Sequence, residues 1–216
     1  MEGTHKRRYN SELRREHAEA TRLRIAEAAR ALMIERGFAD TTMSGVAAAA
    51  GVAVQTLYAT CPGGKPALVK LVYDVTLAGD GRQVPQSERP AVRAIVEEPD
   101  PARKLAMYAA MAVAILGRIG PVHRVLRAAA AAGGAGAGDL LADTERQRRT
   151  GSHQLTGHLA EVGALRPGLT ADRAADEAYA LTSIEVYERL VDVCEWSVEE
   201  YQDWLARTLA GALLAP

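Results

Sequence analysis

The chain has 216 residues, enough for one domain or for a small module joined to a larger one. Its 48% hydrophobic and 25% charged residues are ordinary for a globular protein and exclude disordered, collagen-like and fibrous classes. Its two cysteines lie far apart, outside any CxxC or Cys/His cluster, so we expect neither a disulfide framework nor a zinc site. The apolar stretches fall short of the ~20 residues of a spanning helix, and the first residues lack a signal region. We therefore expect no membrane segment and a cytoplasmic location.

Charge is distributed unevenly, although the net charge is only -1. Residues 1–70 hold 11 Lys and Arg against 7 Asp and Glu, a balance of +4, whereas residues 71–216 hold 15 against 20, a balance of -5. A basic first third on an acidic remainder is typical of a nucleic-acid-binding module joined to a body that does not bind DNA.

Apolar residues recur at helical spacing along the chain, and strand-like alternation is missing, so we predict an all-α fold. The spacing predicts a first helix over residues 20–36, which Gly37 ends. A short helix within residues 41–50, a glycine turn and a second short helix over residues 54–58 have the order of a helix-turn-helix. A tight loop then precedes a further helix over residues 65–77.

The rest of the chain reads as a helical body behind a linker at residues 78–90. We predict a helix from Asp100 to about Pro121, a flexible glycine-rich loop at residues 133–138, a helix capped by Asp139, a helix from Thr170 to about Glu195, and a last helix opened by the capping box of residues 197–200. The body is accordingly expected as a domain at residues 80–216.

The last two helices carry apolar arcs wider than packing on one side requires, so we expect them to face both the core and a second copy of the chain. The residues expected at this homodimer interface are Ile184, Tyr187, Val191, Tyr201, Leu205 and Leu209.

The first third resembles the DNA-binding module of the TetR (tetracycline repressor-like) family of bacterial transcriptional regulators. The resemblance covers about residues 18–70 and rests on residues in the same order across a complete three-helix unit. These are Arg24-Ile25-Ala26, Gly37-Phe38, Thr41-Thr42-Met43, Val46-Ala47, Ala50-Gly51-Val52, Gln55-Thr56-Leu57-Tyr58, Lys65 and Leu68. It implies a helix-turn-helix module followed by a helical bundle for ligand binding and dimerisation. It also implies a regulator, usually a repressor, that leaves a palindromic DNA operator when a small molecule binds.

Site residues carried over from the family lie on the two short helices and just after them. Val54, Gln55 and Thr56 correspond to the exposed start of the recognition helix, and an amide such as Gln55 can bond adenine bidentately. Thr42, Tyr58 and Lys65 correspond to positions that touch phosphates. From the residues alone, the alternative for Thr42 is a helix cap without a phosphate contact, and the alternative for Tyr58 is a core side chain.

Three departures from the family pattern concern the same module. Cys61 stands where the family usually has an aromatic residue, and the extra glycine of Gly63-Gly64 lengthens the path to Lys65. This leaves open whether Lys65 keeps its phosphate contact. Ala53, at the expected cap of the recognition helix, offers no side-chain acceptor.

The sequence says less about the effector and leaves other functions open. Met107, Tyr108, Met111 and His123 are candidates for an effector pocket or, alternatively, plain core residues. No catalytic constellation, metal site or cofactor motif has recognisable spacing, so we do not expect an enzyme. The alternatives are an activator or effector-independent regulator with the same module, and a helical small-molecule-binding protein that has lost DNA binding.

Overall fold

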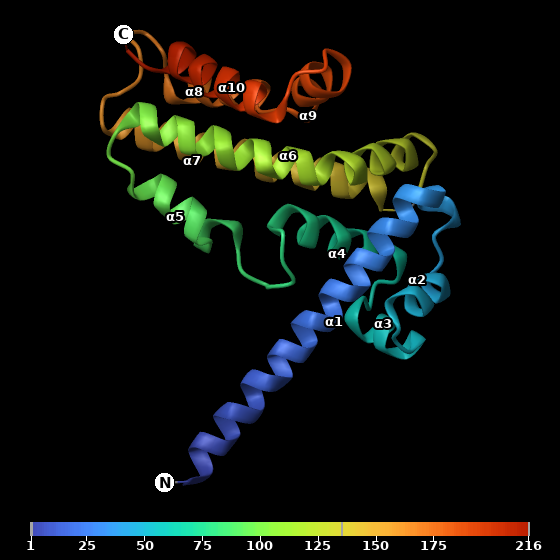
Figure 1. The fold of residues 1–216 in the computed structure, drawn as a ribbon. Helices are drawn as coiled ribbons and strands as arrows, with labels where there is room; N and C mark the ends of the chain where they lie inside the picture. Colours follow the sequence, from blue (N-terminus) through green and yellow to red (C-terminus); the bar gives the residue numbers. More distant parts are fainter. Residues whose placement is uncertain (1, 135, 216) are drawn as a thin grey trace. The chain divides into compact units, whose positions relative to one another are not determined.

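The computed structural model describes residues 2–134 and 136–215, with side chains described from residue 13 onward. The described residues form helices and no strand, which confirms the all-α prediction (Figure 1). The helices are α1 (Glu2–Asp40), α2 (Met43–Ala50), α3 (Val54–Thr60), α4 (Lys65–Ala78), α5 (Pro90–Glu97), α6 (Pro101–Ala131), α7 (Ala137–Glu161), α8 (Ala171–Leu181), α9 (Ile184–Tyr187) and α10 (Val198–Leu213). A short 3-10 turn, Gln86–Glu88, precedes α5, and a π-helical segment, Glu188–Val193, follows α9.

The helices divide into two compact units. The first consists of Met1–Gln83 with Pro121–Leu140, and the second of Val84–Gly120 with Leu141–Pro216. Residues 121–140, which the sequence placed in the body, therefore pack with the helix-turn-helix. Helices α6 and α7 contribute residues to both units.

The core of the first unit forms where α1 packs against α2 and α4. The apolar stripe predicted on α1 supplies Ile25, Ala29 and Met33, all buried. Gly37 interrupts α1 as predicted, with a φ of 81° that favours glycine, so that the chain turns toward α2. The other members of this core are Val46, Ala47, Leu57, Leu68, Val69 and Val72.

Helix α6 continues to Ala131, so its predicted end near Pro121 is wrong. A proline inside a helix has no N–H to donate and costs ~3 kcal/mol. Ile119 before it and Val122 and Leu126 after it are nearly fully buried. Each such side chain contributes about 1.5–3 kcal/mol when buried, so packing outweighs the proline.

Length and composition alone would let α6 cross a membrane. The burial of its side chains in the fold explains the apolar composition of this helix. Leu105, Ala109, Val113 and Leu116 are buried within the second unit, which is the pattern of a core helix.

The core of the second unit also uses one face of α10 against α8. Tyr201, Leu205, Leu209 and Leu213 follow one another at helical spacing and are completely buried. Ser197 opens α10 with the predicted capping box: its hydroxyl accepts from the Glu200 N–H at 3.1 Å, and the Glu200 carboxylate accepts from the Ser197 N–H at 2.7 Å.

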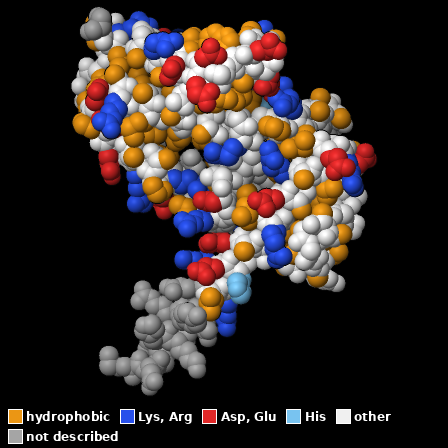
Figure 2. Space-filling view, in the orientation of Figure 1, with side chains coloured by type: hydrophobic (Ala, Val, Ile, Leu, Met, Phe, Trp, Pro, Cys, Tyr) orange, Lys and Arg blue, Asp and Glu red, His pale blue; other side chains and the backbone are white. Residues whose placement is uncertain are grey.

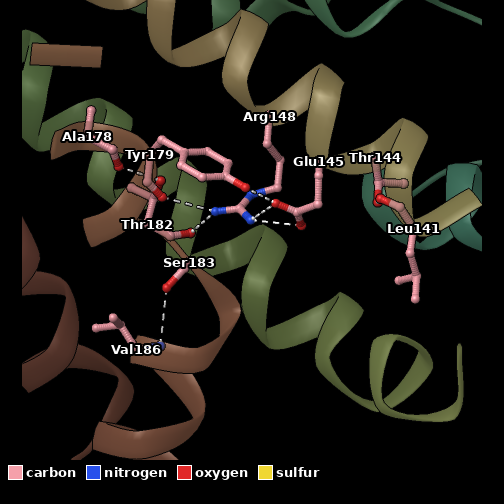
Figure 3. Close-up of polar contacts among 9 residues, drawn as sticks. All are labelled: Leu141, Thr144, Glu145, Arg148, Ala178, Tyr179, Thr182, Ser183 and Val186. Atoms are coloured by element: carbon pink, nitrogen blue, oxygen red, sulfur yellow. Dashed lines mark hydrogen bonds and ion pairs between the residues drawn. The ribbon is translucent and has the colours of Figure 1, made fainter. Parts of the chain in front are cut away.

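The single helix predicted from Thr170 to about Glu195 is broken. Thr170 caps α8 as expected, but α8 ends at Leu181, and Ser183 caps a new start at α9. A side chain from α7 binds at this break: Arg148 donates to the carbonyls of Tyr179 and Thr182, at 3.2 and 3.0 Å, and so satisfies acceptors at the end of α8 (Figure 3).

The linker predicted at residues 78–90 is confirmed to within one residue at each end, because α4 ends at Ala78 and α5 begins at Pro90. Two other predictions need correction. The glycine loop between α6 and α7 is packed rather than free: a Cβ on Gly134 would lie 3.1 Å from Phe38 Cε1, and one on Gly136 would lie 2.9 Å from Pro66 Cβ. Asp139 lies in the first turn of α7, which begins at Ala137, and does not cap it.

Candidate DNA-binding site

The start of α2 has the geometry expected of a capped helix. Thr42 is extended, and its hydroxyl oxygen accepts from the Gly45 N–H at 3.1 Å. A Cβ on Gly45 would lie 3.0 Å from that oxygen, so the glycine leaves room for the cap. Thr42 is exposed, and its hydroxyl hydrogen can still be donated outward. Cap and phosphate contact are therefore compatible roles.

Helix α3 presents a row of exposed side chains beyond the turn. Gly51, with a φ of 64°, ends α2, and Leu57 fixes α3 to the core as its one buried residue. Ala53 at the start of α3 provides no side-chain cap, as predicted. The candidate DNA-contacting residues of α3 that lie exposed are Val54, Gln55, Thr56 and Tyr58. Tyr58 is 49% exposed, so it is not the core side chain that the alternative interpretation predicted.

The surface of α2 and α3 is neutral. Residues 41–64 contain no charged side chain, and this part of the molecule is orange and white in Figure 2. Hydroxyls, one amide and backbone N–H groups are the polar groups it can offer to DNA. Several arginines of the first unit lie on α1 instead, among them Arg24, Arg30 and Arg36.

Lys65, the third expected phosphate contact, turns back toward α1. Its Nζ donates to the carbonyl of Ala39 at 3.0 Å and lies 4.3 Å from the centre of the Phe38 ring. Burial lowers the pKa of Lys65, and the neighbouring Asp40 carboxylate opposes that shift. Local sequence patterns could not predict this contact, because its two partners are 26 residues apart.

Cys61 fills the position where an aromatic residue was expected, and it does so as a core side chain. It is 1% exposed, and burial raises the pKa of its thiol while the charge of Arg22 opposes that shift. A buried thiol with a raised pKa is a poor nucleophile, so this residue contributes packing.

The four residues expected at an effector pocket lie on α6. Met107, Tyr108 and Met111 are half-buried in the second unit. His123 is buried in the first unit. In the part of the chain that the structure describes, no group of three or more His, Cys, Asp or Glu residues could hold a metal ion.

Most residues expected at a dimer interface belong to the core of a single chain. Five of the six are at most 8% exposed: Ile184, Tyr187, Tyr201, Leu205 and Leu209. Val191 is half-exposed. The exposed apolar side chains nearby are instead Val193 and Val198, beside the half-buried Trp196 and Trp204, whose rings meet edge to face at 6.0 Å.

A polar cluster in the second unit was missed because its sequence reads as a solvated helix face. Arg148 donates two hydrogen bonds to the Glu145 carboxylate, at 3.0 and 2.9 Å, besides its bonds to the end of α8. The Tyr179 hydroxyl donates to the same carboxylate, and this hydrogen bond is the main cause that raises the pKa of Tyr179 (Figure 3). The arginine joins α7 to α8 and is not a surface charge.

The family model described as bacterial regulatory proteins, tetR family, matches residues 25–69. These residues run from the core stripe of α1 through the helix-turn-helix into α4. No curated protein matches the sequence.

Solved structures match nearly the whole chain at low sequence identity. A protein from Rhodococcus sp. described as a TetR-family transcriptional regulator is 18% identical, covers 90% of this chain and 98% of its own, and gives a TM-score of 0.67. NalD of Pseudomonas aeruginosa, the secondary repressor of the MexAB-OprM multidrug efflux pump, is 19% identical over 92% of this chain and 98% of its own, with a TM-score of 0.64.

A transcriptional regulator from Saccharomonospora viridis, solved in complex with choline, is 16% identical over 90% of this chain and 98% of its own, with a TM-score of 0.65. At such identities the likeness establishes the fold. The chain therefore has the fold of TetR-family regulators of known structure, and its residues 25–69 match the family model of tetR bacterial regulatory proteins.

Proposed function

We propose that this chain is a homodimeric repressor that binds a palindromic operator through α3 and leaves it when a small molecule binds the body. The observation that carries the proposal is the exposed row on α3, backed by the buried Leu57, in a module that matches the family. A helix held this way can enter a major groove while the first helix of the pair meets the backbone.

Each exposed residue on this module has a role that suits its chemistry. Gln55 reads a base edge, since its amide can pair with adenine N6 and N7. Val54 and Thr56 offer a methyl group and a hydroxyl to neighbouring bases, and the hydroxyls of Thr42 and Tyr58 contact phosphates. Two copies place two such helices in successive major grooves, about 34–36 Å apart, and therefore require a near-palindromic site.

The body supplies the second copy and the effector. The copies meet through the apolar surface formed by the exposed Val193 and Val198 beside the half-buried Trp196 and Trp204. Met107, Tyr108 and Met111 line the effector pocket, because methionine adapts to varied apolar shapes and tyrosine adds a polar group. An effector that binds more tightly to a conformation of the chain that cannot bind the operator weakens operator binding. The loss equals the difference in the effector's binding free energy between the two conformations, typically ~1–3 kcal/mol.

Selection of random double-stranded DNA by the purified chain, at near-physiological salt, tests this function. We expect a near-palindrome with two half-sites to be enriched and the Gln55→Ala, Thr56→Ala double variant to lose that enrichment. Both substitutions are on exposed positions, so the variant should fold. Failure of the folded parent chain to enrich any sequence would contradict the proposal.

The sign of regulation needs a separate measurement. A reporter placed behind the selected operator should be silenced when the chain is expressed and released when an effector is added. Increased expression would identify an activator instead.

A further inference from the structure

The end of α1 and the start of α4 meet at one point, and Lys65 joins them. Lys65 is the first residue of α4, and its Nζ donates to the Ala39 carbonyl at 3.0 Å. The chain between these two residues contains α2, the turn and α3. A bond between Ala39 and Lys65 therefore closes the two ends of the segment that carries the DNA-contacting helices.

The ammonium of Lys65 is compensated by groups of its own chain. A cation at the first position of a helix is disfavoured by the helix dipole and needs acceptors elsewhere. The end of α1 provides them: the Ala39 carbonyl, the face of the Phe38 ring at 4.3 Å, and the Asp40 carboxylate, whose charge raises the pKa of Lys65 against the effect of burial.

The loop that departs from the family pattern holds Lys65 in this place. The Gly64 N–H donates to the Cys61 carbonyl at 2.9 Å, and Gly64 has a φ of 66°, a conformation that favours glycine. Cys61 is buried, so this end of the loop is fixed. The extra residue thus gives Lys65 a defined start on α4 from which its side chain reaches α1.

The turn between α6 and α7 packs against Phe38 and Pro66, the neighbours in sequence of Ala39 and Lys65. A Cβ on Gly134 would lie 3.1 Å from the Phe38 ring, and one on Gly136 would lie 2.9 Å from Pro66 Cβ. The backbone of this turn therefore packs close to the edge of the Phe38 ring, and the Lys65 ammonium lies over the face of the same ring. The side chain that Lys65 contacts is itself held in place.

We propose that Lys65 is a positioning residue, which ties α1 to α4 and so fixes the orientation of α2 and α3, and that it does not contact a DNA phosphate. The inference rests on the proposed DNA-binding function only for its effect on operator binding. The contact itself belongs to the free protein and can be tested without DNA.

The test compares Lys65→Met, which keeps the aliphatic stem and removes the charge, with Lys65→Arg, which keeps a donor and a cation. Lys70→Met is the matched control, because Lys70 lies on the same helix, is exposed and pairs with Asp74 across one turn. Thermal unfolding and amide hydrogen exchange are measured on the free chain. Affinity for the selected operator is measured over a range of salt concentrations.

We expect Lys65→Met to lower Tm by about 2–4 °C relative to Lys70→Met. In Lys65→Met, amide hydrogen exchange should be faster in the peptide covering residues 37–45, and the slope of log K against log salt concentration should equal that of the parent chain. Lys65→Arg should restore both the Tm and the exchange rate. A slope shallower by ~0.9 or more per half-site would assign a phosphate contact and overturn the proposal, whatever the Tm.

An unchanged Tm together with unchanged exchange in Lys65→Met would overturn it as well. If the parent chain binds no DNA, the proposed function fails while the two readings on the free chain still decide the role of Lys65.

Discussion

Tyr201 is a residue whose hydroxyl is buried without a hydrogen-bond partner among the described residues. Its side chain is completely buried, and its ring meets that of Tyr187 edge to face at 5.2 Å. Burial is the main cause that raises its pKa to about 12. An unpaired buried hydroxyl costs about 1–3 kcal/mol, so the ring stabilises the core and the hydroxyl does not.

Tyr201→Phe should therefore leave the free energy of unfolding unchanged or raise it by up to about 1 kcal/mol. The parent should also lose stability as pH rises from about 10, where the unfolded phenol ionises, toward 12, because the folded state keeps its phenol neutral. The variant should lose less over that range. Urea unfolding at pH 7 and at pH 11 measures both effects, and a loss of more than about 1 kcal/mol at pH 7 would mean that the hydroxyl has a partner.

Gln55 is the residue on which sequence preference is expected to depend most. Gln55→Ala should relax base preference at one position of each half-site and cost about 1–3 kcal/mol against the preferred base. Thr42→Ser, which keeps the capping hydroxyl, is the control and should retain the preference. Competition binding with single-base variants of the operator measures this, and an equal loss on every variant would contradict base reading by Gln55.

Among the elements, the break between α8 and α9 depends most on one side chain. Arg148→Met leaves the Tyr179 and Thr182 carbonyls without their donor and Glu145 without its cation, so we expect a loss of about 2–3 kcal/mol. The control Arg149→Met, more exposed and 3.7 Å from Asp176, should cost less than about 0.5 kcal/mol. Chemical denaturation of both variants tests this, and equal small losses would show that α8 ends without Arg148.

The helix ends predicted correctly are those set by local signals. Thr42 before α2, Gly51 after it, Thr170 before α8 and the box at Ser197 act on residues within four positions, so the sequence displays them directly. The unforeseen features come from residues far apart in the chain. Arg148 binds carbonyls at the end of α8 from 31 and 34 residues away, and α6 stays helical through Pro121, where its apolar side chains are buried, against the local preference of proline.

The features of the candidate site likewise divide into those set by local signals and those set by residues far apart in the chain. Exposure of the α3 row follows from the period of one short helix anchored by Leu57, and sequence sufficed for it. The contact of Lys65 with Ala39 and the burial of Tyr201 depend on tertiary packing, which local sequence patterns do not show. From the sequence, Lys65 was therefore expected to contact a phosphate and Tyr201 to contact a partner chain.

For the whole molecule, the burial of Tyr201, Leu205 and Leu209 within one chain leaves a smaller surface for the dimer. Trp204→Glu should shift the mass in solution from dimer to monomer, because it introduces a charge into the proposed apolar contact. Val162→Glu, which changes an apolar side chain 67% exposed just after α7, is the control and should stay dimeric. Light scattering at micromolar protein separates the outcomes, and a dimeric Trp204→Glu would place the contact elsewhere.

The central claim is that two copies of this chain read one palindromic operator through α3. The most direct test is to titrate the selected duplex, and a shuffled duplex of the same composition, with the purified chain and to determine affinity and stoichiometry together. The account predicts two protomers per duplex and binding at least ~10³-fold tighter than to the shuffled sequence. Equal affinity for the two duplexes, or one protomer per selected site, would contradict it.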